Sequence, residues 1–189
     1  MKPGQIRSVT YCFRKRLGGP AAGFTLLELV IVIAILSTLV TIAITRFLAL
    51  QVDAERVAMD TMLGTLRSAL GIKVAELIVK QELGGLGPLA GSNPMERLAE
   101  VPSNYLGAFS NADPSALKSG SWYFDQASKT LVYLVRNADY FSGGLDNPAR
   151  ARFTVSLLYR DRNGNGIYDV GEALEGVRLA AVEPYAWTR

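Results

Sequence analysis

Oxygen-bearing side chains near the C-terminus have the spacing of a calcium-binding loop. Residues 161–172 read DRNGNGIYDVGE, which fits the pattern D-x-[DN]-x-[DN]-G-x5-E. Calcium takes about six to eight hard oxygen ligands, and alternate residues of a tight loop supply them while a glycine permits the sharp turn. The predicted ligands of Ca²⁺ are the side chains of Asp161, Asn163, Asn165, Asp169 and Glu172 and the backbone carbonyl of Ile167.

A second interpretation of this loop remains open. Its Asn-Gly pairs are also typical of turns that need a positive φ, in which case the acids are simply solvated. The metal would have a structural role, because Cys12 is the single cysteine and the chain beyond it can form no internal disulfide. We therefore hypothesise that calcium orders this loop where a disulfide cannot.

Glu28 is the other candidate functional residue, because it is a charged side chain in an apolar segment. It is the only charge among the 22 residues from Phe24 to Thr45, a stretch long and apolar enough to cross a bilayer. A carboxylate near the bilayer centre costs about 2.5–3.5 kcal/mol unless it has a partner. The segment itself offers none, so the partner must be another molecule or an amine created by cutting the chain nearby.

The segment before the apolar run is basic. Residues 1–23 hold five of the 20 basic residues and no acid, which leaves 15 basic and 17 acidic residues for the rest. The positive-inside rule then places residues 1–23 in the cytoplasm and the chain after Arg46 outside. A cleaved secretory signal would have a shorter apolar region and a small-residue cleavage site after it. A plain signal-anchor helix remains the alternative.

The residues around Glu28 are similar to a known processing site. Gly23-Phe24-Thr25-Leu26-Leu27-Glu28, behind a basic leader and ahead of an apolar run, resembles that of type IV pilins and type II secretion pseudopilins. The resemblance implies cleavage after Gly23, methylation of Phe24, and neutralisation of the Phe24 amine by Glu28 of a neighbouring subunit. It also implies three partners: a prepilin peptidase and methyltransferase, other pilin or pseudopilin subunits, and an inner-membrane assembly platform. Ala22 departs from the family, which has Lys or Arg before the glycine.

A long helix should present this segment. No proline occurs between Pro20 and Pro88, and helix-compatible residues continue from Phe24 to about Glu82. Beyond the membrane, apolar residues recur every three or four positions, which marks one face of a helix. These residues are Met59, Leu63, Leu66, Leu70, Val74 and Leu77. This face predicts packing against a sheet.

The second half of the chain carries strand patterns. Residues 122–124 and 130–135 predict a hairpin, and 153–159 and 177–182 predict two further strands. Residues 84–120 predict a long loop with one short helix near 94–101. The expected fold is therefore α+β, a long N-terminal transmembrane helix packed on a small antiparallel sheet, which resembles the pilin fold. Trp122, Tyr123 and Tyr133 are expected between sheet and helix, or else as an exposed ligand-binding aromatic patch.

These patterns divide the chain into a leader over 1–23, a transmembrane or filament-core helix over 24–52, and a periplasmic or extracellular domain over 53–189. The basic excess lies in the leader, so no direct nucleic-acid binding is expected. The chain has no histidine and no nucleophile motif, so no enzyme is expected. The predicted function is a structural subunit, a minor pilin or pseudopilin, of a surface pilus or a secretion pseudopilus. The alternative is a membrane-anchored adhesive module that uses the loops around 138–150 and 161–176.

Overall fold

A computed structural model describes residues 23–145, 147–165, 168 and 172–188. One long helix, α1 (Leu26–Val79), is followed by two sheets. The leader, including Cys12, lies outside the described residues, as do Ile167 and Asp169 of the acidic loop. The chain divides into two compact units, Met1–Ile44 and Thr45–Arg189. The domain boundaries expected after residues 23 and 52 stay predictions.

The second half of α1 confirms the predicted apolar stripe. Five of its six residues are buried, and Val74 is partly buried. The helix ends three residues earlier than expected, because Gln81 adopts a left-handed φ of 59°. The amide of Glu82 then donates to the carbonyl of Leu77, and the amide of Gln81 to that of Ile78. These two bonds form a Schellman motif, which satisfies carbonyls that a helix end leaves without partners.

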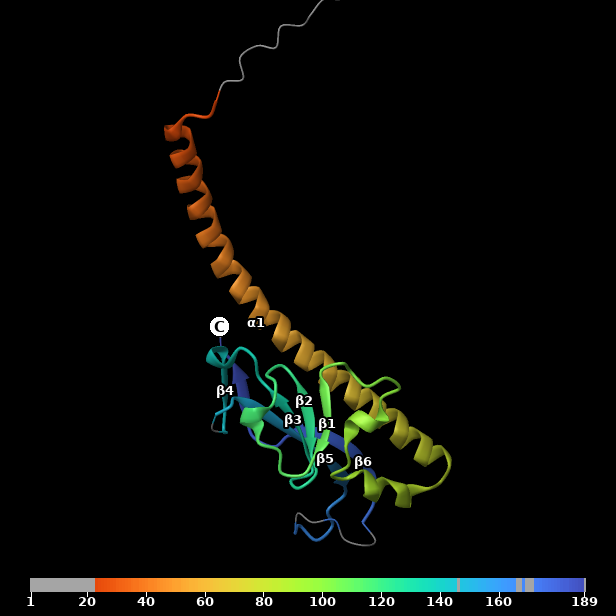
Figure 1. Cartoon of the computed structure of the whole chain (residues 1–189). Helices are drawn as coiled ribbons and strands as arrows, with labels where there is room; N and C mark the ends of the chain where they lie inside the picture. The colour runs from red at the N-terminus through yellow and green to blue at the C-terminus, as the bar shows by residue number, and fades with distance from the viewer. Residues whose placement is uncertain (1–22, 146, 166–167, 169–171, 189) are drawn as a thin grey trace, which may run out of the picture. The chain divides into compact units, whose positions relative to one another are not determined.

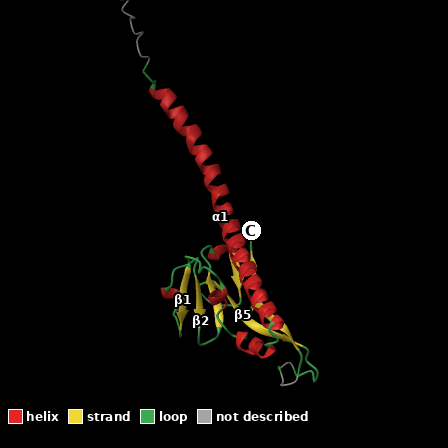
Figure 2. Ribbon diagram, turned by 90° about the vertical axis from the view of Figure 1, so that its right-hand side faces the viewer, coloured by secondary structure: helices red, strands yellow, loops and turns green. Residues whose placement is uncertain are grey.

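The main sheet has five strands in the order β1-β2-β3-β5-β6. Their bounds are β1 Tyr105–Phe109, β2 Trp122–Asp125, β3 Thr130–Leu134, β5 Arg150–Tyr159 and β6 Leu174–Ala181. The predicted hairpin is confirmed as the antiparallel pair β2–β3. In β5, buried and partly exposed residues alternate from Arg150 to Ser156, as expected of a strand with one face in a core. Figures 1 and 2 show the second half of α1 lying along this sheet.

The expected α+β fold, a long helix with a small and mostly antiparallel sheet, is confirmed, but two details differ. Residues 84–120 contain the short helix expected near 94–101, the 3-10 helix η2 (Pro94–Arg97), but they also contain β1, the 3-10 helix η3 (Pro114–Ala116) and most of η1 (Leu83–Leu89). The sheet is not wholly antiparallel either, since β1 pairs with β2 in parallel. Gly107 interrupts β1 with a φ of 109° and a shift in register, so tertiary pairing overrides a weak local strand pattern.

A second small sheet was not predicted. It pairs β4 (Phe141–Gly143) with β7 (Tyr185–Trp187) in antiparallel fashion. Phe141 packs against Tyr185 and Trp187, with ring centroids 5.8 and 5.1 Å apart. Strands of three residues give no periodicity to detect, so only the long-range pairing defines them.

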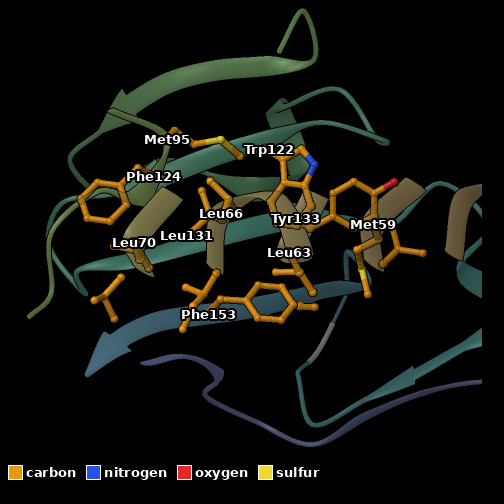
Figure 3. Close-up of a cluster of buried hydrophobic side chains, with 14 residues drawn as sticks. Met59, Leu63, Leu66, Leu70, Met95, Trp122, Phe124, Leu131, Tyr133 and Phe153 are labelled. Atoms are coloured by element: carbon orange, nitrogen blue, oxygen red, sulfur yellow. The ribbon is translucent and has the colours of Figure 1, made fainter. Parts of the chain in front are cut away.

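The core lies between the second half of α1 and the main sheet (Figure 3). Trp122 and Tyr133 pack against each other there, with ring centroids 4.7 Å apart, as expected of sheet–helix core residues. Tyr123 was expected in the same core but lies in a separate cluster with Val132 and Leu134, because successive residues of a strand point to opposite faces. All three aromatic residues are buried, which contradicts the alternative of an exposed aromatic patch.

Candidate functional site

The first described turn of α1 carries the residues of a capping box, Thr25 and Glu28, and shows one of its two hydrogen bonds. Thr25 precedes the helix, and its hydroxyl accepts a hydrogen bond of 3.2 Å from the amide of Glu28. The carbonyl of Thr25 accepts another, of 3.1 Å, from Leu29. The spacing T-x-x-E is the one that sets helix starts in many proteins. The helix therefore begins two residues after Phe24, which leaves the Gly23–Phe24 bond outside the helix.

Gly23 has no packing reason to be glycine in this chain. A side chain built at that position would meet nothing within 4 Å, and its φ lies outside the left-handed region. Phe24 is also exposed, at 71%. Among the described residues, the fold therefore places no steric demand on either residue.

The apolar half of α1 is exposed on all sides. It is the one helix in the described part of the chain that is long and apolar enough to cross a membrane, with a mean hydropathy of 2.7 and none of the apolar window buried. Its hydroxyls need no water, because Ser37, Thr38 and Thr41 each donate to a carbonyl four residues earlier. A segment whose hydroxyl groups are satisfied within the helix suits lipid or the core of a helical assembly.

The structure provides no partner for the Glu28 carboxylate among the described residues. Among the described residues, its carboxylate has no ion pair and accepts no hydrogen bond from a side chain. The capping bond to Thr25 uses the backbone amide and leaves the carboxylate available. The structure thus brings Phe24, Thr25 and Glu28 together in one turn, with the carboxylate directed at no group of its own chain that is described.

The acidic loop joins β5 to β6. Asp161 accepts a bond of 2.6 Å from the amide of Gly164, and Asn163 accepts one of 3.0 Å from Asn165. Glu172, at the other end, accepts a bond of 2.8 Å from the amide of Arg162. The first and last acids of the loop therefore each accept a hydrogen bond from a backbone amide within residues 162–164.

The structure places only part of the predicted metal site. Asp161, Asn163, Asn165 and Glu172 are described, whereas Ile167 and Asp169 lie outside the described residues. Within the described ranges, no group of three or more His, Cys, Asp or Glu side chains is arranged to hold a metal. The calcium hypothesis is neither confirmed nor contradicted by this arrangement.

Glu55 is a structural polar residue that the sequence interpretation missed. Its carboxylate accepts four hydrogen bonds from the end of β3 and the turn that follows. The donors are the Tyr133 hydroxyl, the Arg136 amide and both the amide and the side chain of Asn137. Burial, and next the charge of Glu55, raise the pKa of Tyr133 above its usual range, so the phenol stays a donor. One signal was present: Glu55 lies one turn before Met59, on the line of the apolar stripe.

The comparison with protein families returned one match. Residues 20–44 match the family described as the prokaryotic N-terminal methylation motif. This span contains the Gly23–Phe24 bond, the capping box and most of the exposed apolar helix. No curated protein and no solved structure matches this chain.

Proposed function

We propose, from the N-terminal methylation motif that this chain carries and that is characteristic of type IV pilins and pseudopilins, that the protein is a prepilin-like structural subunit. A prepilin peptidase cleaves it between Gly23 and Phe24 and methylates the new amino group. The mature chain then assembles with other subunits through its apolar helix. It acts by packing and performs no catalysis.

The observation that carries this proposal is the processing motif directly ahead of an apolar helix that is exposed on every side. Cleavage after Gly23 would create a positive amine on Phe24, four residues before Glu28. Inside an apolar assembly both charges need a partner of opposite sign, because an unpaired charge is costly there. Pairing between neighbouring subunits therefore neutralises both charges inside an apolar assembly.

We further propose a location and a branch of the family. Before cleavage the chain is held in the inner membrane with its N-terminus in the cytoplasm, and afterwards it enters a pseudopilus or a cell-surface pilus. The helix has no proline in its apolar half and the domain has no disulfide, which favours a minor pilin or pseudopilin. A membrane anchor that is not processed would not account for Gly23 before the helix or for Glu28 within the apolar run.

Calcium binding to the loop 161–172 is a separate proposal. The residues fit the ion in donor type, because carboxylate and amide oxygens are its preferred ligands, and Glu172 lies against the amide of Arg162 at the start of the loop. Asp161, Asn163, Asn165, the Ile167 carbonyl, Asp169 and Glu172 would hold it. The bound ion would neutralise the acids and fix the β5–β6 connection.

The test is mass spectrometry of the native protein in inner-membrane and sheared-filament fractions. Chains beginning at a methylated Phe24 are expected, in filaments for a pilus subunit and in the membrane for a pseudopilin. A protein that still begins at Met1 in both fractions would overturn the proposal. Glu28→Gln should abolish assembly while leaving cleavage intact, and Glu82→Gln, an exposed acid beyond the end of the same helix, serves as the control.

A further inference from the structure

A cavity opens at the start of the folded unit. It has a volume of about 400 Å³ and is lined by Thr45, Arg46, Ala49, Val52, Asp53 and Tyr140. Five of these residues come from α1, and Tyr140 comes from the 3-10 helix η4 (Ala138–Tyr140). The cavity belongs neither to the processing segment nor to the acidic loop.

The cavity lies directly after the apolar run in the sequence, which places it near the membrane surface. The apolar run ends at Thr45, and Arg46 is the first charge after Glu28. If the run crosses the bilayer, Arg46 must lie at the level of the lipid phosphates, where long basic side chains and tyrosines collect. The cavity then opens among the phospholipid headgroups.

The two charges of the cavity lie on one side of the helix. Arg46 and Asp53 are seven residues apart, which is two turns and about 10 Å along the axis at ~1.5 Å per residue. Neither side chain has a hydrogen bond or an ion pair within the described part of the chain. Between them Ala49 and Val52 provide an apolar wall, and Tyr140 is 40% exposed.

We propose that this cavity binds the headgroup of a phospholipid that carries a primary ammonium, such as an ethanolamine phospholipid. The proposal rests on the membrane insertion of the Phe24–Thr45 segment proposed above. Arg46 binds the phosphate by charge-assisted hydrogen bonds. Asp53 accepts from the ammonium, which also lies against the face of Tyr140.

The order of the charges selects this headgroup. The phosphate is attached to the glycerol, nearer the hydrocarbon, and the ammonium is at the outer end. Arg46 likewise lies next to the apolar run, and Asp53 lies two turns farther out. A lipid with a phosphate but no ammonium would leave Asp53 without a cationic partner, and a quaternary ammonium has no proton to donate to it.

The test uses the full-length chain reconstituted into vesicles of ethanolamine and glycerol phospholipids, and into vesicles in which choline phospholipid replaces ethanolamine phospholipid. Native mass spectrometry then counts the lipid molecules that stay with the released protein. The wild type should retain ethanolamine phospholipid in preference to the other two. Arg46→Gln and Asp53→Asn should each lower this retention about tenfold, the factor for losing one charge-assisted hydrogen bond.

Matched controls come from the same helix. Arg56→Gln and Asp60→Asn remove an exposed charge of each sign outside the cavity and should retain lipid as the wild type does. Equal retention by all variants, or equal retention of all three lipids, would overturn the proposal while leaving membrane insertion intact. A wild type that carbonate washing strips from the vesicles would instead overturn membrane insertion, and this proposal with it.

Discussion

The carboxylate of Glu55 in α1 lies 2.9 Å from the hydroxyl of Tyr133 in β3, across 78 residues of sequence. The same carboxylate caps the turn after β3 through the amides of Arg136 and Asn137. Tyr133 also packs against Trp122 in the core. One acidic side chain thus joins the helix, the sheet and the following turn, and fixes where along α1 the sheet is attached.

Replacing this acid should weaken the domain. We expect Glu55→Gln to lower the free energy of unfolding by about 2 kcal/mol, because hydrogen bonds to a charged acceptor contribute more than neutral ones and the amide adds a donor where only donors point. Urea unfolding of the detergent-solubilised full chain measures this. The double variant with Tyr133→Phe should lose less than the two single losses combined; full additivity would mean that the pair is not coupled.

The apolar stripe on α1 predicts that substitutions on its two faces lower the free energy of unfolding by very different amounts. Leu66 is fully buried, whereas Ile72 on the same helix is 72% exposed. Leu66→Ala should lower the free energy of unfolding by about 2–5 kcal/mol, since it leaves a cavity between helix and sheet. Ile72→Ala should change it by no more than about 0.5 kcal/mol. Similar losses for both, in the same urea experiment, would contradict the packing of α1 described here.

Glu76 should make stability fall in acid. Hydrogen bonds from Lys80 and Lys73 lower its pKa from 4.5 to about 2. A carboxylate whose pKa is lowered by folding stabilises the folded state when the pH is above its pKa in the unfolded chain. This contribution is lost as the pH falls from about 4.5 toward 2. The wild type should therefore lose its advantage over Glu76→Gln in that window. Because the group is fully exposed, added salt should shrink the difference at neutral pH, and a difference independent of pH would contradict the ion pairs.

Calcium should raise the melting temperature if the acidic loop binds it. After chelator treatment, adding about 1 mM calcium should stabilise the wild type, because a ligand that binds only the folded state favours it. Glu172→Gln should remove most of this increase. Glu175→Gln, which alters an exposed acid paired with Arg160, should keep it. A wild-type melting temperature unchanged by calcium would end the metal hypothesis.

The sequence by itself determined the elements that depend on local pattern. Glu28 within an apolar run, the processing motif from Gly23 to Glu28 and the stripe from Met59 to Leu77 all follow from the types and spacing of residues along the chain. The hairpin β2–β3 follows from two strand patterns joined by a short turn. Each of these features is settled by neighbours within a few residues, so their interpretation needed no tertiary structure.

Only the tertiary structure decided what depends on distant partners. The parallel pairing of β1 with β2, the sheet of β4 and β7, and the face on which Tyr123 lies have no local pattern that defines them. Glu55 is the clearest case, because a single exposed-looking acid on a helix gives no sign of the donors that gather around it after folding. Hydrogen bonds and packing between segments some 80 residues apart are created by the fold, and a residue's type alone does not specify its partner.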